Sequence, residues 1–86
     1  MTARNEWHVY LVRCNDGTLY TGMTNNLQRR MAQHNGVKAG GAKYTAARRP
    51  VQLVYLEACE SRADASRREY RLRKLPRAKK LALIDP

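Results

Sequence analysis

The stretch HVYLVRCNDGTLYTGMTNNLQRRMAQH, residues 8–34, contains the most informative pattern of this chain. Its first part, VYLVRC at 9–14, is apolar enough to predict a β-strand. Asp16 and Gly17 follow, and this dipeptide is a strong signal for a hairpin turn. TLYTGM at 18–23 is therefore expected to form the antiparallel partner strand, with a helix directly after it.

Two tyrosines lie on this hairpin, Tyr10 on the first strand and Tyr20 on the second. The two-residue period of a strand places Tyr20 on the opposite face from Thr21 and Met23. Gly22 lies inside the second strand, which indicates a bulge or the close approach of another group. Either tyrosine alone is explained by ordinary strand packing, because β-strands favour tyrosine.

The helix of this stretch is expected over residues 26–34. Asn25 is a favourable N-cap, and Gln28 lies three residues after it, as in a capping box. Gly36 is expected to end the helix.

Helical spacing separates the two neighbouring arginines of this helix. Leu27, Met31 and His34 share one stripe, and the two apolar residues mark it as the buried side. Arg30 lies on the same stripe, whereas Arg29 points to solvent. Two simple alternatives remain. Arg30 could extend past the core to water, and His34 could be a histidine favoured by the helix C-terminus.

The rest of the chain predicts two more helices and one more strand. The segments are a glycine-rich basic loop at 36–44, a strand at 51–59 opened by Pro50, a helix at 61–75 and a short helix at 76–84. Ser61 and Asp64 form an N-capping signature, and Pro76 stands at the favoured first position of a helix. The predicted order is β-β-α-β-α-α. The fold class is therefore α+β, with a small, mainly antiparallel three-stranded sheet flanked by helices, in a single domain over residues 1–86.

Charge is the strongest compositional signal. The chain has 17 Lys and Arg residues against 7 Asp and Glu, a net charge of +10. Such an excess favours a polyanionic partner, most often nucleic acid. A membrane is not expected as a partner, because no apolar run approaches the ~18 residues of a spanning helix. Without a signal peptide at the start, the protein is expected in the cytoplasm. Cys14 and Cys59 lack metal-ligand spacing and are expected to be inert thiols.

Glu69 is the lone acidic residue in the strongly basic run at 67–74. It lies four residues after Ala65 and three before Leu72, on the apolar stripe of its helix. One interpretation is an ordinary ion pair with Arg73, four residues on. The other is a carboxylate that holds a hard cation such as Mg²⁺, whose remaining ligands are water and phosphate oxygens.

The order and spacing of these motifs resemble the GIY-YIG nuclease family. HVY at residues 8–10 stands where the family has Gly-Ile-Tyr, and YTG at 20–22 stands where it has Tyr-Ile-Gly. The family's helix arginine and histidine fall on Arg30 and His34, and its metal-binding glutamate falls on Glu69.

The resemblance covers a motif core from Trp7 to Ile84, nearly the whole chain. GAKYTAARRPVQLVY and the ending LPRAKKLALI resemble the small, single-domain, largely uncharacterised bacterial branch of the family. The resemblance implies the GIY-YIG nuclease fold.

The resemblance also implies a mechanism, because the family cuts phosphodiester bonds with one divalent metal, here Mg²⁺ or Mn²⁺. Tyr10 or Tyr20 would position or deprotonate the attacking water. Arg30 would stabilise charge on the phosphate, and His34 would assist in positioning or proton transfer. Glu69 would hold the metal. Which tyrosine is the base stays open.

Some positions depart from the family pattern. His8 replaces the first glycine, and Thr21 replaces an apolar residue. Met23 stands where several relatives carry a lysine, and no asparagine follows Glu69. These departures concern the rate and specificity of cleavage, not the fold.

Three functions are compatible with these features. The first is a metal-dependent endonuclease in DNA repair or processing, acting on DNA that includes branched, damaged or single-stranded structures. The second is a nucleic-acid-binding module with little or no turnover, and the third is an adaptor for an acidic protein. We expect a monomer. The candidate substrate contacts, which could equally be a solvated charged loop, are Lys43, Tyr44, Arg48 and Arg49.

Overall fold

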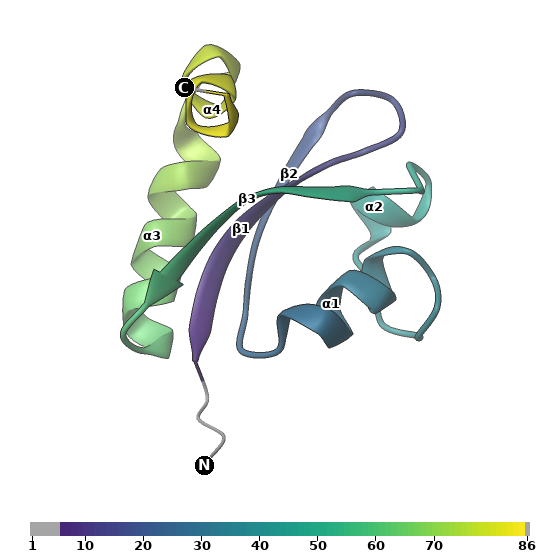
Figure 1. Cartoon of the computed structure of the whole chain (residues 1–86), viewed down its shortest axis with the longest axis horizontal. Coiled ribbons are helices and arrows are strands. Elements are labelled where there is room, and N and C mark those ends of the chain that lie inside the picture. Colours follow the sequence, from purple (N-terminus) through teal and green to yellow (C-terminus); the bar gives the residue numbers. More distant parts are fainter. Residues whose placement is uncertain (1–5, 86) are drawn as a thin grey trace.

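A three-stranded antiparallel sheet with helices on both faces forms the structure, a computed structural model that describes residues 6–85 (Figure 1). The elements are, in chain order, β1 (Trp7–Arg13), β2 (Leu19–Thr24), α1 (Leu27–His34), α2 (Lys43–Ala46), β3 (Gln52–Cys59), α3 (Arg62–Lys74) and α4 (Arg77–Ile84). α3 covers one face of the sheet, and α1 and α2 lie on the other. The predicted α+β class with a small antiparallel sheet is confirmed.

β1 is the central strand, with β2 and β3 at the edges. Its residues Val9, Tyr10, Leu11 and Val12 are all fully buried, which explains why this strand reads as a continuous apolar run. Val9 and Leu11 belong to the core under α3, whereas Tyr10 and Val12 belong to the core under α1. The sheet therefore separates two small cores, and each face of β1 contributes to one of them.

The hairpin turn between β1 and β2 is stabilised by its own side chains. Gly17 adopts a φ of 85°, a left-handed conformation that favours glycine. The Asp16 carboxylate accepts hydrogen bonds from the Thr18 amide at 3.1 Å and the Thr18 hydroxyl at 2.6 Å. The turn thereby fixes which residues of the two strands face each other.

This register brings the two tyrosines together. Tyr10 pairs with Gly22, and Val12 pairs with Tyr20. Tyr10 and Tyr20 are consequently diagonal neighbours on the same face of the sheet. A Cβ at Gly22 would overlap the Tyr10 hydroxyl and ring. The close approach that a glycine inside this strand predicts is therefore made by Tyr10, which lies across β2 at this point.

The start of α1 differs from the prediction. Asn26, not Asn25, is the N-cap, and its side chain accepts a hydrogen bond from the Arg29 amide at 3.2 Å. The Thr24 hydroxyl accepts from the Asn26 amide at 3.0 Å and so forms a local turn that delays the helix by one residue. Gly36 ends the helix region with a φ of 82°, as predicted.

The predicted order β-β-α-β-α-α lacks α2, a single helical turn that begins at the end of the segment 36–44 expected to be a loop. One turn of helix next to two glycines has no local signal, because such short helices depend on tertiary contacts. Other boundaries differ by only one or two residues, as in β3, which begins at Gln52, and α4, where Pro76 is the N-cap rather than the first helical residue.

The contact between Gly22 and Tyr10 gives a first testable prediction. Gly22→Ala should lower the free energy of unfolding by about 2–3 kcal/mol, because the added methyl group would overlap the fully buried ring and hydroxyl of Tyr10. Gly17→Ala is the matched control. It meets open space but adopts a strained backbone, so we expect a loss of about 1 kcal/mol. Urea denaturation measures both, and equal losses would contradict the proposed contact.

Candidate active site

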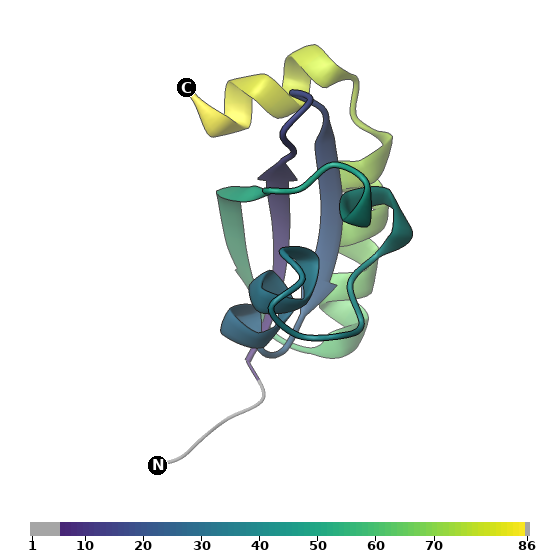
Figure 2. The same ribbon diagram turned by 90° about the vertical axis from the view of Figure 1, so that its right-hand side faces the viewer.

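Tyr10, Tyr20 and His34 form a cluster on the face of the sheet that α1 covers. The Tyr10 hydroxyl lies 2.7 Å from Nε2 of His34. The rings of Tyr10 and Tyr20 meet the imidazole edge-on, with centroids 5.8 Å and 5.3 Å from it. Figure 2 shows the helices and the sheet from the side, with α1 and α2 in front of the sheet and α3 behind it. We call these three residues the tyrosine–histidine cluster.

His34 is the last residue of α1 and is fully buried. Its Nδ1 lies 2.8 Å from the Thr45 hydroxyl of α2, which in turn donates to the Ala42 carbonyl at 3.0 Å. Burial lowers the pKa of His34 from 6.5 to about 4, and the nearby charges of Arg30 and Arg49 act in the same direction. The imidazole is therefore neutral at pH 7. The alternative of a helix-end histidine that is favoured as a cation does not describe this residue.

The two tyrosines differ in their access to solvent. Tyr10 is fully buried, and this burial raises its pKa. Arg30 opposes this increase, whereas the charges of Tyr20 and Glu69 add to it. Tyr20 is only half-buried and so reaches the surface. Of the two phenols, Tyr20 is the one that a substrate or a surface water can touch.

Arg30 lies at the border of the cluster, as the helical stripe predicts. It is half-buried, whereas Arg29 is exposed. One guanidinium nitrogen of Arg30 donates to the Gln33 side chain at 3.0 Å and to the Gly40 carbonyl at 2.9 Å. Arg30 is therefore fixed against the glycine-rich loop and does not simply extend into water.

Glu69 approaches from α3, on the other face of the sheet. It lies between the buried residues Ala65 and Leu72, and its side chain is 20% exposed. One carboxylate oxygen accepts from the Arg73 guanidinium at 3.2 Å, so the simple ion pair is present. Its charge nevertheless contributes to the raised pKa of Tyr10. This contribution is the smallest of those that act on the Tyr10 pKa.

The donor set at Glu69 fits only one type of metal site. Within residues 6–85, no three His, Cys, Asp or Glu side chains gather as metal ligands. A site built from several protein ligands, as structural zinc requires, is incompatible with this arrangement. Mg²⁺ and Mn²⁺ fit better, because such ions often take one or two carboxylates and keep water and phosphate oxygens as further ligands.

Tyr44 lies next to the cluster, although it is distant from it in the sequence. Its ring stacks on Tyr20 with a centroid distance of 5.8 Å and an interplanar angle of 28°. The Arg48 guanidinium lies 4.0 Å from the centre of the Tyr44 ring, and Arg48 also bonds Asp16 of the hairpin turn at 3.0 Å. α2 is thereby tied to the hairpin, and an exposed aromatic and a cation lie beside Tyr20.

The other two predicted substrate contacts of this segment, Lys43 and Arg49, have environments that differ from those of Tyr44 and Arg48. Lys43 is exposed. Arg49 donates to the carbonyl of His34 at 2.7 Å, so its guanidinium is engaged at the end of α1. Met23 packs against the core under α3. Thr45 was missed by sequence reasoning, because no local pattern marks a threonine that bonds a histidine eleven residues away.

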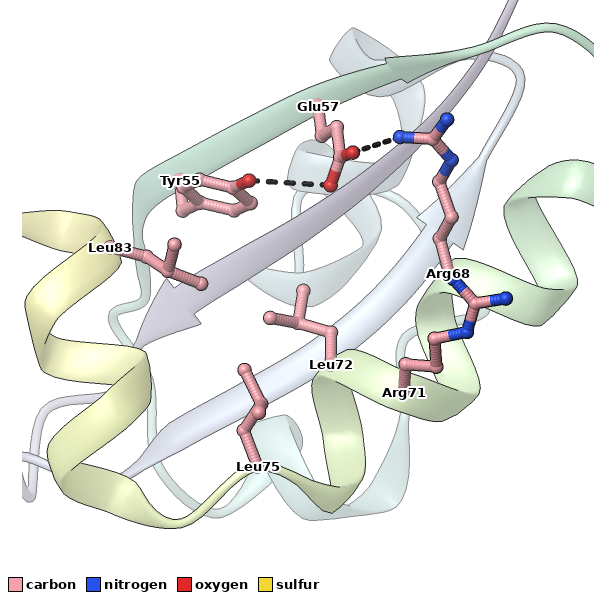
Figure 3. A pocket seen from close by; sticks show the side chains of 7 residues that line it. All are labelled: Tyr55, Glu57, Arg68, Arg71, Leu72, Leu75 and Leu83. Atoms are coloured by element: carbon pink, nitrogen blue, oxygen red, sulfur yellow. Dashed lines mark hydrogen bonds and ion pairs between the residues drawn. The ribbon is translucent and has the colours of Figure 1, made fainter.

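A groove of about 370 Å³ lies elsewhere, between β3, α3 and α4 (Figure 3). It is lined by Tyr55, Glu57, Arg68, Arg71, Leu72, Leu75 and Leu83. Glu57 forms an ion pair with Arg68 and accepts a hydrogen bond from Tyr55. The groove contains none of the residues predicted for the site, so the candidate chemistry lies at the tyrosine–histidine cluster instead.

Comparison with known proteins gives consistent matches over nearly the whole chain. The model of the GIY-YIG catalytic domain matches residues 6–82. A UPF0213 protein of Desulfotalea psychrophila is 52% identical over 83 residues, which cover 96% of this chain and 74% of that protein. A UPF0213 protein of Halobacterium salinarum is 53% identical over 77 residues, covering 90% of this chain and 97% of its own length. Relatives therefore occur in archaea as well as in the predicted bacterial branch.

Solved structures agree with this match. The solution NMR structure of a UPF0213 protein from Bacillus halodurans is 40% identical, with a TM-score of 0.57, and the similarity covers 92% of this chain and 82% of that one. The solution NMR structure of a protein from E. faecalis is 32% identical, with a TM-score of 0.61 and coverage of 93% and 83%. Among residues 6–85, no helix is both long and apolar enough to cross a membrane.

The lowered pKa of His34 predicts how stability depends on pH. Unfolded His34 binds a proton near pH 6.5, whereas folded His34 binds it only near pH 4. Between these values the unfolded state holds more protons, so the free energy of unfolding should fall as the pH decreases. The full loss is on the order of 3 kcal/mol. Asp16 and Asp64, whose pKa values are lowered from 3.8, affect stability only at lower pH.

Urea denaturation of the wild type and His34→Gln between pH 7.5 and 4 measures this effect. Only the wild type should lose stability steeply across the window. An NMR titration of the His34 ring protons tests the same point if the variant does not fold. A midpoint near 6.5 would contradict the buried neutral histidine.

Proposed function

Because the chain belongs to the GIY-YIG catalytic domain family, we propose that it is a divalent-metal-dependent endonuclease that hydrolyses DNA phosphodiester bonds. The observation that carries this proposal is the tyrosine–histidine cluster itself. Strand register and the absent side chain of Gly22 bring Tyr10, Tyr20 and His34 together at the border where Arg30 lies. The whole chain would act as one catalytic domain.

Tyr20 is the residue that we assign to the attacking water. Its exposure at the surface supports this role, whereas Tyr10 has no exposed surface and would act behind it. Arg30 supplies positive charge beside the two tyrosines. Its guanidinium has several N–H donors that would bind a phosphate there. His34 would act through Tyr10, since its Nε2 faces that hydroxyl and no solvent.

Glu69 is the residue that would hold Mg²⁺ or Mn²⁺. When bound, such an ion stabilises negative charge on the phosphate and on the departing oxygen. One carboxylate oxygen of Glu69 accepts a hydrogen bond from Arg73. To bind a metal ion, Glu69 must therefore either break this exposed ion pair or share its carboxylate between Arg73 and the ion. Exposed ion pairs of this kind contribute only about 0.3–0.5 kcal/mol, so the pair opens easily.

The charge of the chain supports DNA as the substrate. A net charge of +10 on 86 residues provides attraction to phosphates irrespective of sequence. The stack of Tyr44 on Tyr20, with the Arg48 guanidinium over the Tyr44 ring, supports a contact of these residues with a nucleic-acid strand at the cluster. Lys43 adds an exposed cation on the same short helix. A cytoplasmic role in DNA repair or processing fits such a substrate.

A nucleic-acid-binding module with little turnover is the second candidate function. Two of the proposed catalytic side chains already form hydrogen bonds within the chain. Arg30 donates to the Gly40 carbonyl, and Glu69 accepts from Arg73. Met23 offers no positive charge where several relatives carry a lysine. Binding alone needs only phosphate contacts, which the basic surface provides.

Cleavage of plasmid and single-stranded DNA with Mg²⁺, Mn²⁺ or a chelator separates these functions. Tyr20→Phe and Glu69→Gln should each lower the cleavage rate at least about 100-fold, because each removes a group proposed to act in the transition state. Tyr70→Phe, an exposed tyrosine on α3, is the matched control and should cut like the wild type.

Two results would contradict the proposed site or the proposed activity. Cutting that persists unchanged in both variants would show that the assigned site is wrong. DNA binding by the wild type without any cutting under all three conditions would favour the binding module.

Salt dependence gives an independent prediction about the partner. Affinity for a short DNA strand should fall by about tenfold or more between 50 and 200 mM NaCl, because phosphate contacts release condensed counterions. Fluorescence anisotropy at several salt concentrations measures the slope. A flat dependence would argue against phosphate contacts and for an acidic protein partner.

A further inference from the structure

The hydroxyl of Thr45 determines where the protons lie in the buried core of the cluster. A threonine hydroxyl has one proton to donate. Thr45 donates it to the Ala42 carbonyl at 3.0 Å, because a carbonyl oxygen can only accept. Toward Nδ1 of His34, at 2.8 Å, Thr45 can therefore only accept. It follows that Nδ1 carries a proton.

The same reasoning fixes the Tyr10 hydroxyl. A neutral imidazole carries one ring proton, so with Nδ1 protonated Nε2 must be an acceptor. The group 2.7 Å from Nε2 is the Tyr10 hydroxyl, which therefore donates. The hydrogen bonds run in one direction, from Tyr10 to His34, from His34 to Thr45 and from Thr45 to Ala42. All three side chains are fully buried, so surface water does not compete with this order.

We propose that Thr45 is a positioning residue that holds His34 as the Nδ1–H tautomer and thereby directs the Tyr10 proton into His34. The catalytic consequence rests on the proposed nuclease function. With its proton directed inward, Tyr10 keeps its oxygen lone pairs for donors on the other side. The donor side chains available near Tyr10 are Tyr20, its diagonal neighbour on the sheet, and Arg30, which lowers the pKa of Tyr10. His34 itself stays neutral, because burial and the charges of Arg30 and Arg49 disfavour its cation, so its role is to orient the Tyr10 hydroxyl and not to take up a proton.

The position of Thr45 depends on the segment between α1 and β3. Arg30 holds this segment through the Gly40 carbonyl at 2.9 Å, and Arg49 holds the end of α1 through the His34 carbonyl at 2.7 Å. α2 carries Thr45 over the imidazole and Tyr44 over Tyr20. The single turn of α2 thus contributes two contacts to the cluster, a buried one from Thr45 to His34 and an exposed one from Tyr44 to Tyr20.

The experiment compares Thr45→Val, which keeps the shape but removes the hydroxyl, with Thr45→Ser, which keeps the hydroxyl. The tautomer of His34 is read directly by ¹⁵N NMR of the histidine ring nitrogens, at a pH where the ring is neutral. The wild type and Thr45→Ser should show a protonated Nδ1. Thr45→Val should show a protonated Nε2, because Nδ1 then faces a methyl group while Nε2–H can still donate to the Tyr10 oxygen.

Two results would overturn the proposal. One is a wild-type His34 that carries its proton on Nε2, a measurement that needs no variant and holds if Thr45→Val fails to fold. The other is a folded Thr45→Val whose His34 keeps Nδ1 protonated.

Cleavage assays test the catalytic consequence separately. Thr45→Val should lower kcat about 10- to 100-fold, in the range usual for residues that orient a catalytic group. The KM for DNA should stay within about twofold, and Thr45→Ser should restore most of the rate. An inverted tautomer with unchanged kcat would overturn the positioning role. If the wild type cuts no DNA, the nuclease proposal fails, while the NMR result still decides the proton order.

Discussion

The hydrogen bond between Tyr10 and His34 joins the sheet to the helix that follows it, and the candidate site depends on this contact. It forms because the Tyr10 ring lies across β2 at a residue with no side chain, Gly22. Both partners are fully buried, so the bond forms without competition from water and leaves neither polar group unpaired. A buried hydrogen bond at the centre of a small core is costly to break, so it holds the groups around it in fixed positions.

The groups around this bond come from both faces of the sheet. α1 and α2 supply Arg30, Tyr44 and Thr45, and α3 supplies Glu69. Placing the cations and the carboxylate on different elements keeps Arg30 and Glu69 from neutralising each other directly, and each bonds a neighbour instead. Arg30 thus belongs to the face of the sheet that carries the tyrosine–histidine cluster, and Glu69 to the helix on the opposite face.

Much of the fold and part of the site can be predicted from local patterns. The Asp16–Gly17 turn predicts the hairpin, and the strand period predicts that Tyr20 and Met23 face opposite ways. Helical spacing distinguishes Arg30 from Arg29. These predictions hold because each depends on residues within a few positions of one another. The one-turn helix α2 and the N-cap at Asn26 were not predicted, since the first depends on tertiary contacts and the second on a competing local turn.

Local patterns along the chain are enough to predict the elements, their order apart from α2, the basic charge and the residue types available for chemistry. Which groups those residues contact depends on how the elements pack. This packing buries Tyr10 and leaves Tyr20 at the surface, engages Arg49 at the end of α1, and places Thr45 against His34. The physical reason is that burial and proton direction depend on neighbours brought together from distant parts of the chain. A hydroxyl on α2 sets the tautomer of a histidine on α1, and no spacing along the sequence encodes that contact.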